Sequence, residues 1–348
     1  FAEYQNSVIA ELGTGYTPTE EFADPSLLGE GTDWQDAIFR QGFTMDHQLG
    51  ISGGKENTSY YFSAGYFDQK GILIGSDFKR YSTRFNLDSQ VKKWLRAGIS
   101  SNITRAIQNV TLADAAESTI WWATLQNPLI PVRNLDGTWA GNYTVGGYTY
   151  TADNPVATSN SRGNKGVNSQ IFGNIYADVI FFEGLSLRNE FSYQLGLQNN
   201  MAFQYEANIG TRSLQAQLYD SRNNSYYYAV RNYLNYNKNL GKHKLAFTGG
   251  HEAQYSYWEN MGGKKVDLQN NILDMNAGGT DKLTWDLTGG KGDWAMESYF
   301  ARGNYTFDDR YSLSLSYRGD KSSNFGPNKK WGFFPGASVG WTATNEKF

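Results

Sequence analysis

The sequence predicts an all-β chain of antiparallel strands, on three observations. Apolar and polar residues alternate over many stretches, as they do in a strand whose two faces meet different surroundings. Aromatic residues make up 16% of the 348 residues, which also include 38 Gly but only 7 Pro. Short and long connections alternate between these stretches.

The composition excludes several classes of protein. The chain has no Cys, so it holds neither a disulfide framework nor a Cys-ligated metal site. The 31 Lys and Arg nearly balance the 34 Asp and Glu, which gives a net charge of −3. The chain therefore lacks the excess of basic residues that is typical of nucleic-acid-binding proteins. No run approaches the roughly 18 apolar residues of a membrane-spanning helix. Abundant aromatic residues argue against disorder.

The first part of the chain differs from the rest. In residues up to about 40, apolar and polar residues do not alternate. Residues that favour turns occur there at Asp24–Ser26 and Gly29–Gly31. We therefore divide the chain into a junction, residues 1–44, and a strand-rich part, residues 45–348. The aromatic Phe348 is not preceded by the alternation expected of a terminal barrel strand. We expect both ends to be cuts in a longer protein.

The alternation defines about eleven strands of roughly 9 to 14 residues. Between Tyr311 and Arg318, Tyr and Leu occupy one face, and Ser and Arg the other. The segments Ser169–Phe181 and Leu185–Leu197 also separate an apolar face from a more polar one. The remaining strands are predicted to begin near Met45, Thr58, Phe78, Trp94, Ser225, His243, Ala295 and Trp331.

Every short connection between two predicted strands is followed by a long one. The tight turns are predicted at 55–57, 92–93, 182–184, 237–242 and 308–310. The long connections are predicted at 68–77, 106–167, 199–224, 257–294 and 319–330. A transmembrane β-barrel has this asymmetry, because its periplasmic turns are short and its extracellular loops carry the function. The sequence thus favours a segment of an antiparallel transmembrane β-barrel with long extracellular loops.

Alternation alone does not distinguish this barrel from a soluble protein. A β-sandwich or propeller that binds glycan would bury its apolar face in a core, and a hydrolase embedded in a barrel is a third alternative. Aromatic residues beside the tight turns, such as Trp94 and Tyr311, favour the membrane, where they lie at the headgroup level. Small residues on the apolar face favour it too, because lipid fills around them: Gly173, Ala177, Ala301 and Gly303.

Three stretches carry a resemblance to a known family. They are Phe22–Gly29 with Thr32–Arg40; Leu49–Gly54, Tyr60–Tyr66, Gly71-Ile72 and Arg80–Asp88; and Ala301–Tyr305, Tyr317–Gly326 and Trp331–Trp341. Together they resemble the SusC/RagA family of TonB-dependent outer-membrane transporters of Bacteroidetes.

The resemblance implies a longer protein with an N-terminal plug and a 22-stranded barrel. This chain would supply the junction after the plug and about the first half of the barrel. The region that contacts TonB–ExbB–ExbD would lie upstream, and a SusD-like surface lipoprotein would cap the barrel. The implied function is import of oligosaccharides or peptides across the outer membrane of a Gram-negative bacterium, with no cofactor.

Aromatic residues in the long connections are the candidate substrate contacts. Sugars present apolar C–H faces that stack on aromatic rings, although the same rings can equally pack the loop or a partner. A short helix over Ala113–Trp122 is expected in the first loop, capped by Thr111 or Asp114. The candidates are Trp121, Trp122, Trp139, Tyr143, Tyr148, Tyr150, Trp258, Trp285 and Trp294.

Charged residues within the strands are expected to face the lumen. An Arg on the lipid face costs about 2–4 kcal/mol at the bilayer midplane. The residues so assigned are Arg188, Glu190, Arg302 and Arg318.

The sequence predicts no catalytic site and no metal site. The histidines His47, His243 and His251 lack the spacing of paired metal ligands. We therefore expect a protein that is not an enzyme.

Overall fold

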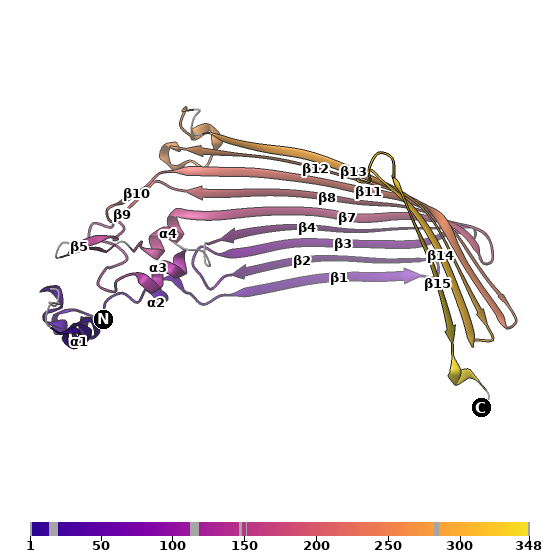
Figure 1. Cartoon of the computed structure of the whole chain (residues 1–348), viewed down its shortest axis with the longest axis horizontal. Helices are drawn as coiled ribbons and strands as arrows, with labels where there is room; N and C mark the ends of the chain where they lie inside the picture. Colours follow the sequence, from indigo (N-terminus) through magenta and orange to yellow (C-terminus); the bar gives the residue numbers. More distant parts are fainter. Residues whose placement is uncertain are drawn as a thin grey trace.

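The computed structural model describes residues 2–13, 20–111, 118–145, 148–150, 152–281 and 285–346. Its main feature is one antiparallel sheet of 11 strands (Figure 1). Every strand in it pairs with its predecessor along the chain, apart from small insertions, as successive hairpins require. In order, the strands are β1 (Thr44–Lys55), β2 (Thr58–Lys70), β3 (Asp77–Lys92), β4 (Leu95–Val110), β7 (Arg162–Phe182), β8 (Leu185–Gln204), β11 (Gln217–Leu240), β12 (His243–Val266), β13 (Asp286–Phe307), β14 (Tyr311–Ser322) and β15 (Trp331–Trp341).

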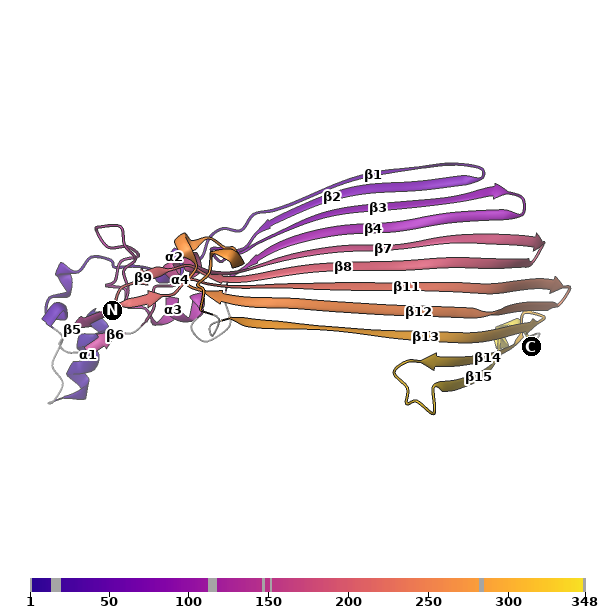
Figure 2. The same cartoon turned by 90° about the horizontal axis from the view of Figure 1, so that it is seen from above.

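The expected asymmetry of the connections is confirmed. The tight turns lie at one end of the sheet, and the long connections lie at the other, except that the β14–β15 connection lies partway along β13 because β14 pairs only as far as Met296 (Figure 2). We call these the turn end and the loop end. In the turn between β13 and β14, Asp308 and Asp309 both have positive φ, of 51° and 54°, a conformation that Asp tolerates better than most residues.

The loop end carries the helices and two small hairpins. Helix α2 (Trp34–Ile38) packs on α3 (Thr119–Leu125), which packs on α4 (Pro155–Ser161). The buried Trp34 Nε1 donates to the Asn127 carbonyl at 3.1 Å and ties the junction to the first long loop. The remaining elements are α1 (Ala2–Leu12), the hairpin β5 (Tyr143–Val145) and β6 (Tyr148–Tyr150), the hairpin β9 (Ala207–Ile209) and β10 (Arg212–Leu214), and the single 3₁₀ turns 20–22, 25–27, 269–271, 275–277 and 343–345.

The helix expected in the first loop begins later than predicted. Ser118 is its N-cap, and the Ser118 hydroxyl accepts from the Trp121 N–H at 3.2 Å. The Thr111 hydroxyl instead donates to the Ile74 carbonyl at 2.8 Å, so Thr111 does not cap it. Asp114 lies outside the described residues.

Several strands are longer than the alternation indicated. β8 and β11 remain paired up to Gln204 and Gln217, inside the segment predicted as a connection. β12 and β13 likewise pair as far as Lys264 and Asp286. Beyond the apolar band, polar and apolar residues no longer alternate along these strands, since the polar pair Asn199-Asn200 is followed by the apolar run Met201–Phe203. The backbone ladder persists there, but the pattern that identifies a strand from sequence is lost.

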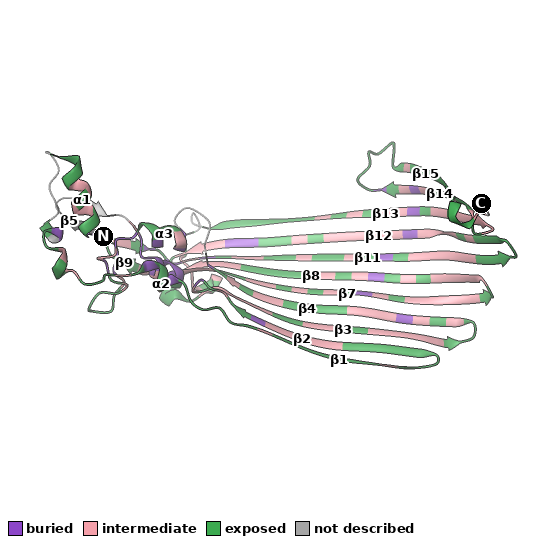
Figure 3. Ribbon diagram, turned by 90° about the horizontal axis from the view of Figure 1, so that it is seen from below, coloured by how far each residue is buried: buried purple, intermediate pink, exposed green. Residues whose placement is uncertain are grey.

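The sheet exposes its apolar face and has no large core of its own. Figure 3 shows buried segments gathered among the helices, while most of each strand is intermediate or exposed. The largest cluster of buried apolar side chains is formed by Trp34, Ile38, Leu73, Ala123, Ile130 and Ala140 at the loop end. In the described residues, the remaining strands form only two small hairpins, so no second sheet stacks on this one. The sandwich alternative is therefore wrong.

The small residues of the apolar face behave in two ways. A Cβ added at Gly303 would meet open space, as expected of a position that lipid can fill. A Cβ added at Gly173 would lie 2.4 Å from the Tyr193 ring, so there an aromatic ring from the next strand already fills the gap. None of the helices in the described part of the chain is long and apolar enough to cross a membrane.

Candidate functional site

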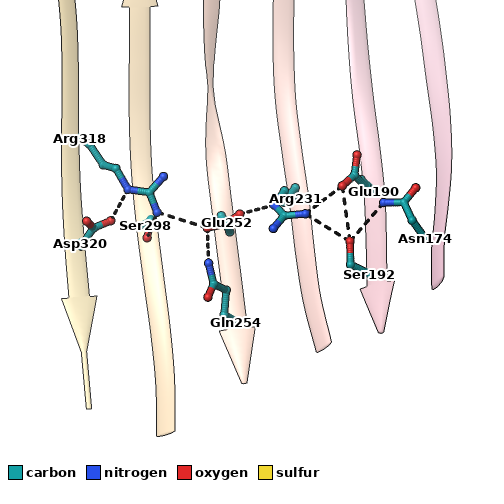
Figure 4. A network of polar contacts seen from close by, with 9 residues as sticks. All are labelled: Asn174, Glu190, Ser192, Arg231, Glu252, Gln254, Ser298, Arg318 and Asp320. Atoms are coloured by element: carbon teal, nitrogen blue, oxygen red, sulfur yellow. Dashed lines mark hydrogen bonds and ion pairs between the residues drawn. The ribbon is translucent and has the colours of Figure 1, made fainter. Parts of the chain in front are cut away.

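A continuous network of charged and hydroxyl side chains crosses six strands of the sheet (Figure 4). We call it the polar ladder. Its members come from β7, β8, β11, β12, β13 and β14, one or two from each, and alternate between basic, acidic and neutral groups. They are Asn174, Glu190, Ser192, Arg231, Glu252, Gln254, Ser298, Arg318 and Asp320.

Strand register places these residues side by side. Arg231 of β11 is directly opposite Glu190 of β8 and Glu252 of β12. Glu252 is in turn opposite Ser298, which is opposite Asp320. Residues directly opposite in an antiparallel pair share a face and have Cβ atoms about 5 Å apart. One transverse row of five strands therefore brings these side chains into contact.

Glu252 is the centre of the ladder. Its carboxylate accepts from the Arg231 guanidinium, and its Oε1 also accepts from Arg318 Nη2 at 3.2 Å. The side chain of Glu252 is only 8% exposed. A carboxylate buried to this degree needs its cationic partners, because an unpaired buried charge is costly.

Each arginine of the ladder bridges several groups. Arg231 Nη1 donates to Glu190 Oε1 at 2.9 Å and to Ser192 Oγ at 3.2 Å. Arg318 donates to Asp320 Oδ1 at 2.7 Å and to Ser298 Oγ at 2.9 Å. The planar guanidinium suits such multiple contacts, which fix the strands laterally.

A second ion pair lies on the same face nearer the turn end. Arg188 and Asp178 are directly opposite and form two parallel hydrogen bonds, of 2.6 and 2.7 Å. The Arg188 guanidinium also lies 4.1 Å from the centre of the Tyr176 ring. Tyr176 extends the network to Asp88, to which its hydroxyl donates.

The opposite face of the same strands is apolar and open. Leu315 of β14 is 53% exposed, and Val339 of β15 is 85% exposed. Ile175, Phe191, Val230 and Phe247 are similarly exposed on neighbouring strands. The usual distribution of a soluble protein is therefore inverted, with charges packed together and aliphatic side chains uncovered.

The four charged residues assigned to the lumen share one face. Glu190 and Arg318 are members of the polar ladder, and Arg188 pairs with Asp178 on the same face. Arg302 is four residues from Ser298 in β13, and its Nε donates to Asn304 Oδ1 at 3.3 Å. The sequence reasoning did not select Glu252, because its role depends on arginines 21 and 66 residues away in the chain.

Trp258 lies in strand β12 and not in a loop as predicted. It is six residues beyond Glu252, on the face of the polar ladder, and is 42% exposed. Its ring covers Gly292 of β13, where an added Cβ would lie 2.9 Å from the ring nitrogen. The glycine therefore lets the indole lie against the neighbouring strand.

Two further aromatic residues share this region. Trp294, also predicted in the loop, lies in β13 on the ladder face, and its ring is 6.4 Å from that of Tyr227. Tyr227 was not selected from the sequence, although it is four residues from Arg231 and so on the same face. We call Tyr227, Trp258 and Trp294 the aromatic group.

The other predicted aromatics are dispersed. The centre of the Trp285 ring lies 4.3 Å from the Lys265 ammonium. Lys265 is in β12, on the face opposite the polar ladder. In the first loop, Trp121 is exposed on α3, and the Trp139 ring lies 3.6 Å from the Arg133 guanidinium. The indole nitrogen of Trp122 is buried without a hydrogen-bond partner in the described residues. The side chains of Tyr143, Tyr148 and Tyr150 lie outside what the structure describes.

Two acidic residues outside the sheet have perturbed protonation. The Thr138 hydroxyl and backbone N–H both donate to Asp136, at 2.6 and 2.9 Å, and lower the pKa of its carboxyl. At the turn end, hydrogen bonds from the Tyr311 hydroxyl and the Trp341 indole lower the pKa of Glu346. In the described part of the chain, no group of three or more His, Asp or Glu is arranged to hold a metal ion.

Comparison with known proteins gives consistent results. No family model matches the chain. TonB-dependent receptor P3 of Formosa agariphila is 29% identical over 329 residues, which cover 91% of this chain and 32% of that protein. TonB-dependent receptor SusC of Bacteroides thetaiotaomicron is 26% identical over 363 residues, covering 93% of this chain and 34% of that protein. The chain thus spans about a third of the length of these curated relatives.

A solved structure of the RagAB peptide transporter shares the fold. It superposes with a TM-score of 0.75 at 23% identity, over 97% of this chain and 37% of that one. The eleven-stranded sheet therefore corresponds to a segment of a barrel wall. In sequence, the chain is therefore similar to TonB-dependent receptors, SusC among them, over the third of those proteins that it spans, and in fold it is similar to the RagAB transporter structure.

Proposed function

We propose that this chain forms part of the wall of an outer-membrane β-barrel in a Gram-negative bacterium. The observation that carries the proposal is the inverted sheet, with the polar ladder on one face and uncovered aliphatic side chains on the other. The uncovered aliphatic face is compatible with contact with lipid, and the polar ladder is compatible with a hydrated lumen. The strands β1 and β15 end the sheet, and pairing with further strands would close the barrel, as lipid requires.

We propose further that the whole protein imports a nutrient in a TonB-dependent manner. The relatives that share this part of the chain are named TonB-dependent receptors. The contact with TonB–ExbB–ExbD would be made by a region of the whole protein that lies upstream of this barrel segment. Import requires binding and release and no bond cleavage, so we assign no catalytic role to any residue.

The loop end is the proposed entry side for the solute. The long connections and the aromatic group lie at or toward that end. A SusD-like surface lipoprotein is the proposed partner there, with Trp121 on α3 available for contact with it or with the solute. The solute is an oligosaccharide or a peptide; the RagAB relative is described as a peptide transporter, and the exposed indole of Trp258 suits the C–H face of a sugar.

Uptake by intact cells tests this proposal. The natural gene would be deleted and restored in cells grown on a defined oligosaccharide or peptide mixture as the sole carbon source. We expect uptake to be lost on deletion, restored by the gene, and lost again when TonB is absent. Recovery of the natural protein in the soluble fraction, monodisperse without detergent, would refute the membrane assignment.

A further inference from the structure

A cavity of about 500 Å³ lies at the loop end, on the same face as the polar ladder. Its floor comes from four adjacent strands, β7, β8, β11 and β12. Its other side comes from the helices, through Thr119 of α3 and Thr158 of α4. Ligand sites in proteins typically have volumes of about 300–1,000 Å³.

Strand register shows which side chains reach the cavity. Asn164, Ala202, Tyr219 and Lys264 are directly opposite one another across the four strands. Lys264 is twelve residues beyond Glu252 in an unbroken strand, so its side chain belongs to the ladder face. Tyr219 is likewise twelve residues before Arg231. The cavity and the ladder therefore lie on one continuous surface.

The chemistry of the cavity suits an anion. Lys264 and Arg162 both line it, and none of its described lining residues is acidic. Lys264 forms no ion pair with any residue that the structure describes. Asp286 is opposite Lys264 in β13, but it is exposed and does not line the cavity.

A buried hydroxyl lacks a partner at the same place. The Thr158 side chain is 3% exposed, and its Oγ1 has no hydrogen-bond partner in the described residues. The neighbouring hydroxyls are satisfied, since Thr119 and Ser159 bond to each other at 2.8 Å. Buried polar groups are almost always hydrogen-bonded, so an orphaned hydroxyl on a cavity wall indicates a missing partner.

We infer that this cavity binds a carboxylate group of the imported solute, held by the Lys264 ammonium, with the Thr158 hydroxyl donating to it. The inference rests on the proposed transport function and refines its substrate class. The carboxylate can come from a uronic acid sugar or from the C-terminus of a peptide. Both present the same planar acceptor, which an ammonium group and a hydroxyl recognise.

The test is binding to the purified natural protein in detergent, measured by calorimetry with two pairs of probes. One pair is trigalacturonate and its neutral counterpart, galactotriose. The other is a short peptide with a free C-terminus and the same peptide amidated. We expect one acidic probe to bind about tenfold more tightly than its neutral partner, the discrimination that a charged hydrogen bond typically gives. The pair that shows the preference identifies the source of the carboxylate.

A matched pair of variants ties the preference to the cavity. Lys264→Gln should abolish the preference for the acidic probe. Lys265→Gln makes the same charge change at the next residue, on the opposite face against Trp285, and should preserve it.

The outcomes separate this inference from the proposed function. If the neutral probes bind as tightly as the acidic ones, or if Lys264→Gln leaves the preference intact, the carboxylate site is refuted while import stands. If no probe of either pair binds, both the carboxylate site and import of these two solute classes are refuted.

Discussion

The two faces of the sheet are built from the same strands, yet they hold opposite kinds of side chain. Val230 is exposed on the apolar face, while the next residue, Arg231, joins two carboxylates of the polar ladder. On one face, the charged groups satisfy one another laterally across strands. On the other, aliphatic side chains such as Leu315 and Val339 are more than half exposed. This difference indicates that the sheet separates an aqueous environment from a lipid one, and that neither face is a protein core.

A charge placed on the apolar face should have the largest effect on stability. Leu315→Arg should destabilise the natural protein by about 2–4 kcal/mol if lipid contacts this position near the midplane. Ser314→Arg, one residue away on the ladder face, should cost less than about 1 kcal/mol, because an aqueous lumen hydrates the guanidinium. Urea unfolding in lipid vesicles measures both. Equal costs would contradict the assignment of the two faces.

Removing the centre of the polar ladder tests the other face. Glu252→Ala should cost about 2 kcal/mol, because it leaves Arg231 and Arg318 without their shared carboxylate. This value is discounted because both arginines are partly exposed. Glu259→Ala, in the same strand but on the other face, loses only hydrogen bonds to Tyr257 and Asn224 and should cost less than about 1 kcal/mol. The same unfolding assay compares them, and a larger loss for Glu259→Ala would refute the central role of Glu252.

Two tryptophans on opposite faces should contribute differently to solute binding. Trp258→Ala should weaken solute binding about fivefold, since an indole contact of about 50 Å² contributes about 1 kcal/mol. Trp285→Ala should change it less than about twofold, because that ring lies against Lys265 on the other face. Calorimetric titration of the natural protein with its solute distinguishes them. A stronger effect of Trp285→Ala would move the binding surface away from the ladder face.

The smallest expected effect concerns the turn end and depends on pH. Because hydrogen bonds lower the pKa of Glu346, its stabilising contribution is complete above the ordinary glutamate pKa of about 4.5 and is lost as the pH falls through the lowered value. Tryptophan fluorescence should therefore change on acidification below about pH 4.5 as Trp341 loses its partner. Glu346→Gln should remove this change. An identical titration in the variant would show that Glu346 is not its source.

Local pattern predicted much of the architecture correctly. Alternation over neighbouring residues predicts the number and order of the strands of the large sheet, the tight turns at 55–57 and 308–310, and the common face of Arg188 and Glu190. The strand ends beyond the apolar band do not, because polar and apolar residues no longer alternate there. The first-loop helix was displaced because Ser118, rather than an earlier residue, caps it.

Alternation along each strand is enough to give it one polar and one apolar face, because successive side chains of a strand point to opposite sides whatever the strand pairs with. Which of these side chains meet depends on the folded sheet. Glu252 lies between Arg231 and Arg318, and Trp258 lies over Gly292, because of the register between strands, which is a relation between distant segments. A shift of one residue in that register would have moved these side chains to the other face.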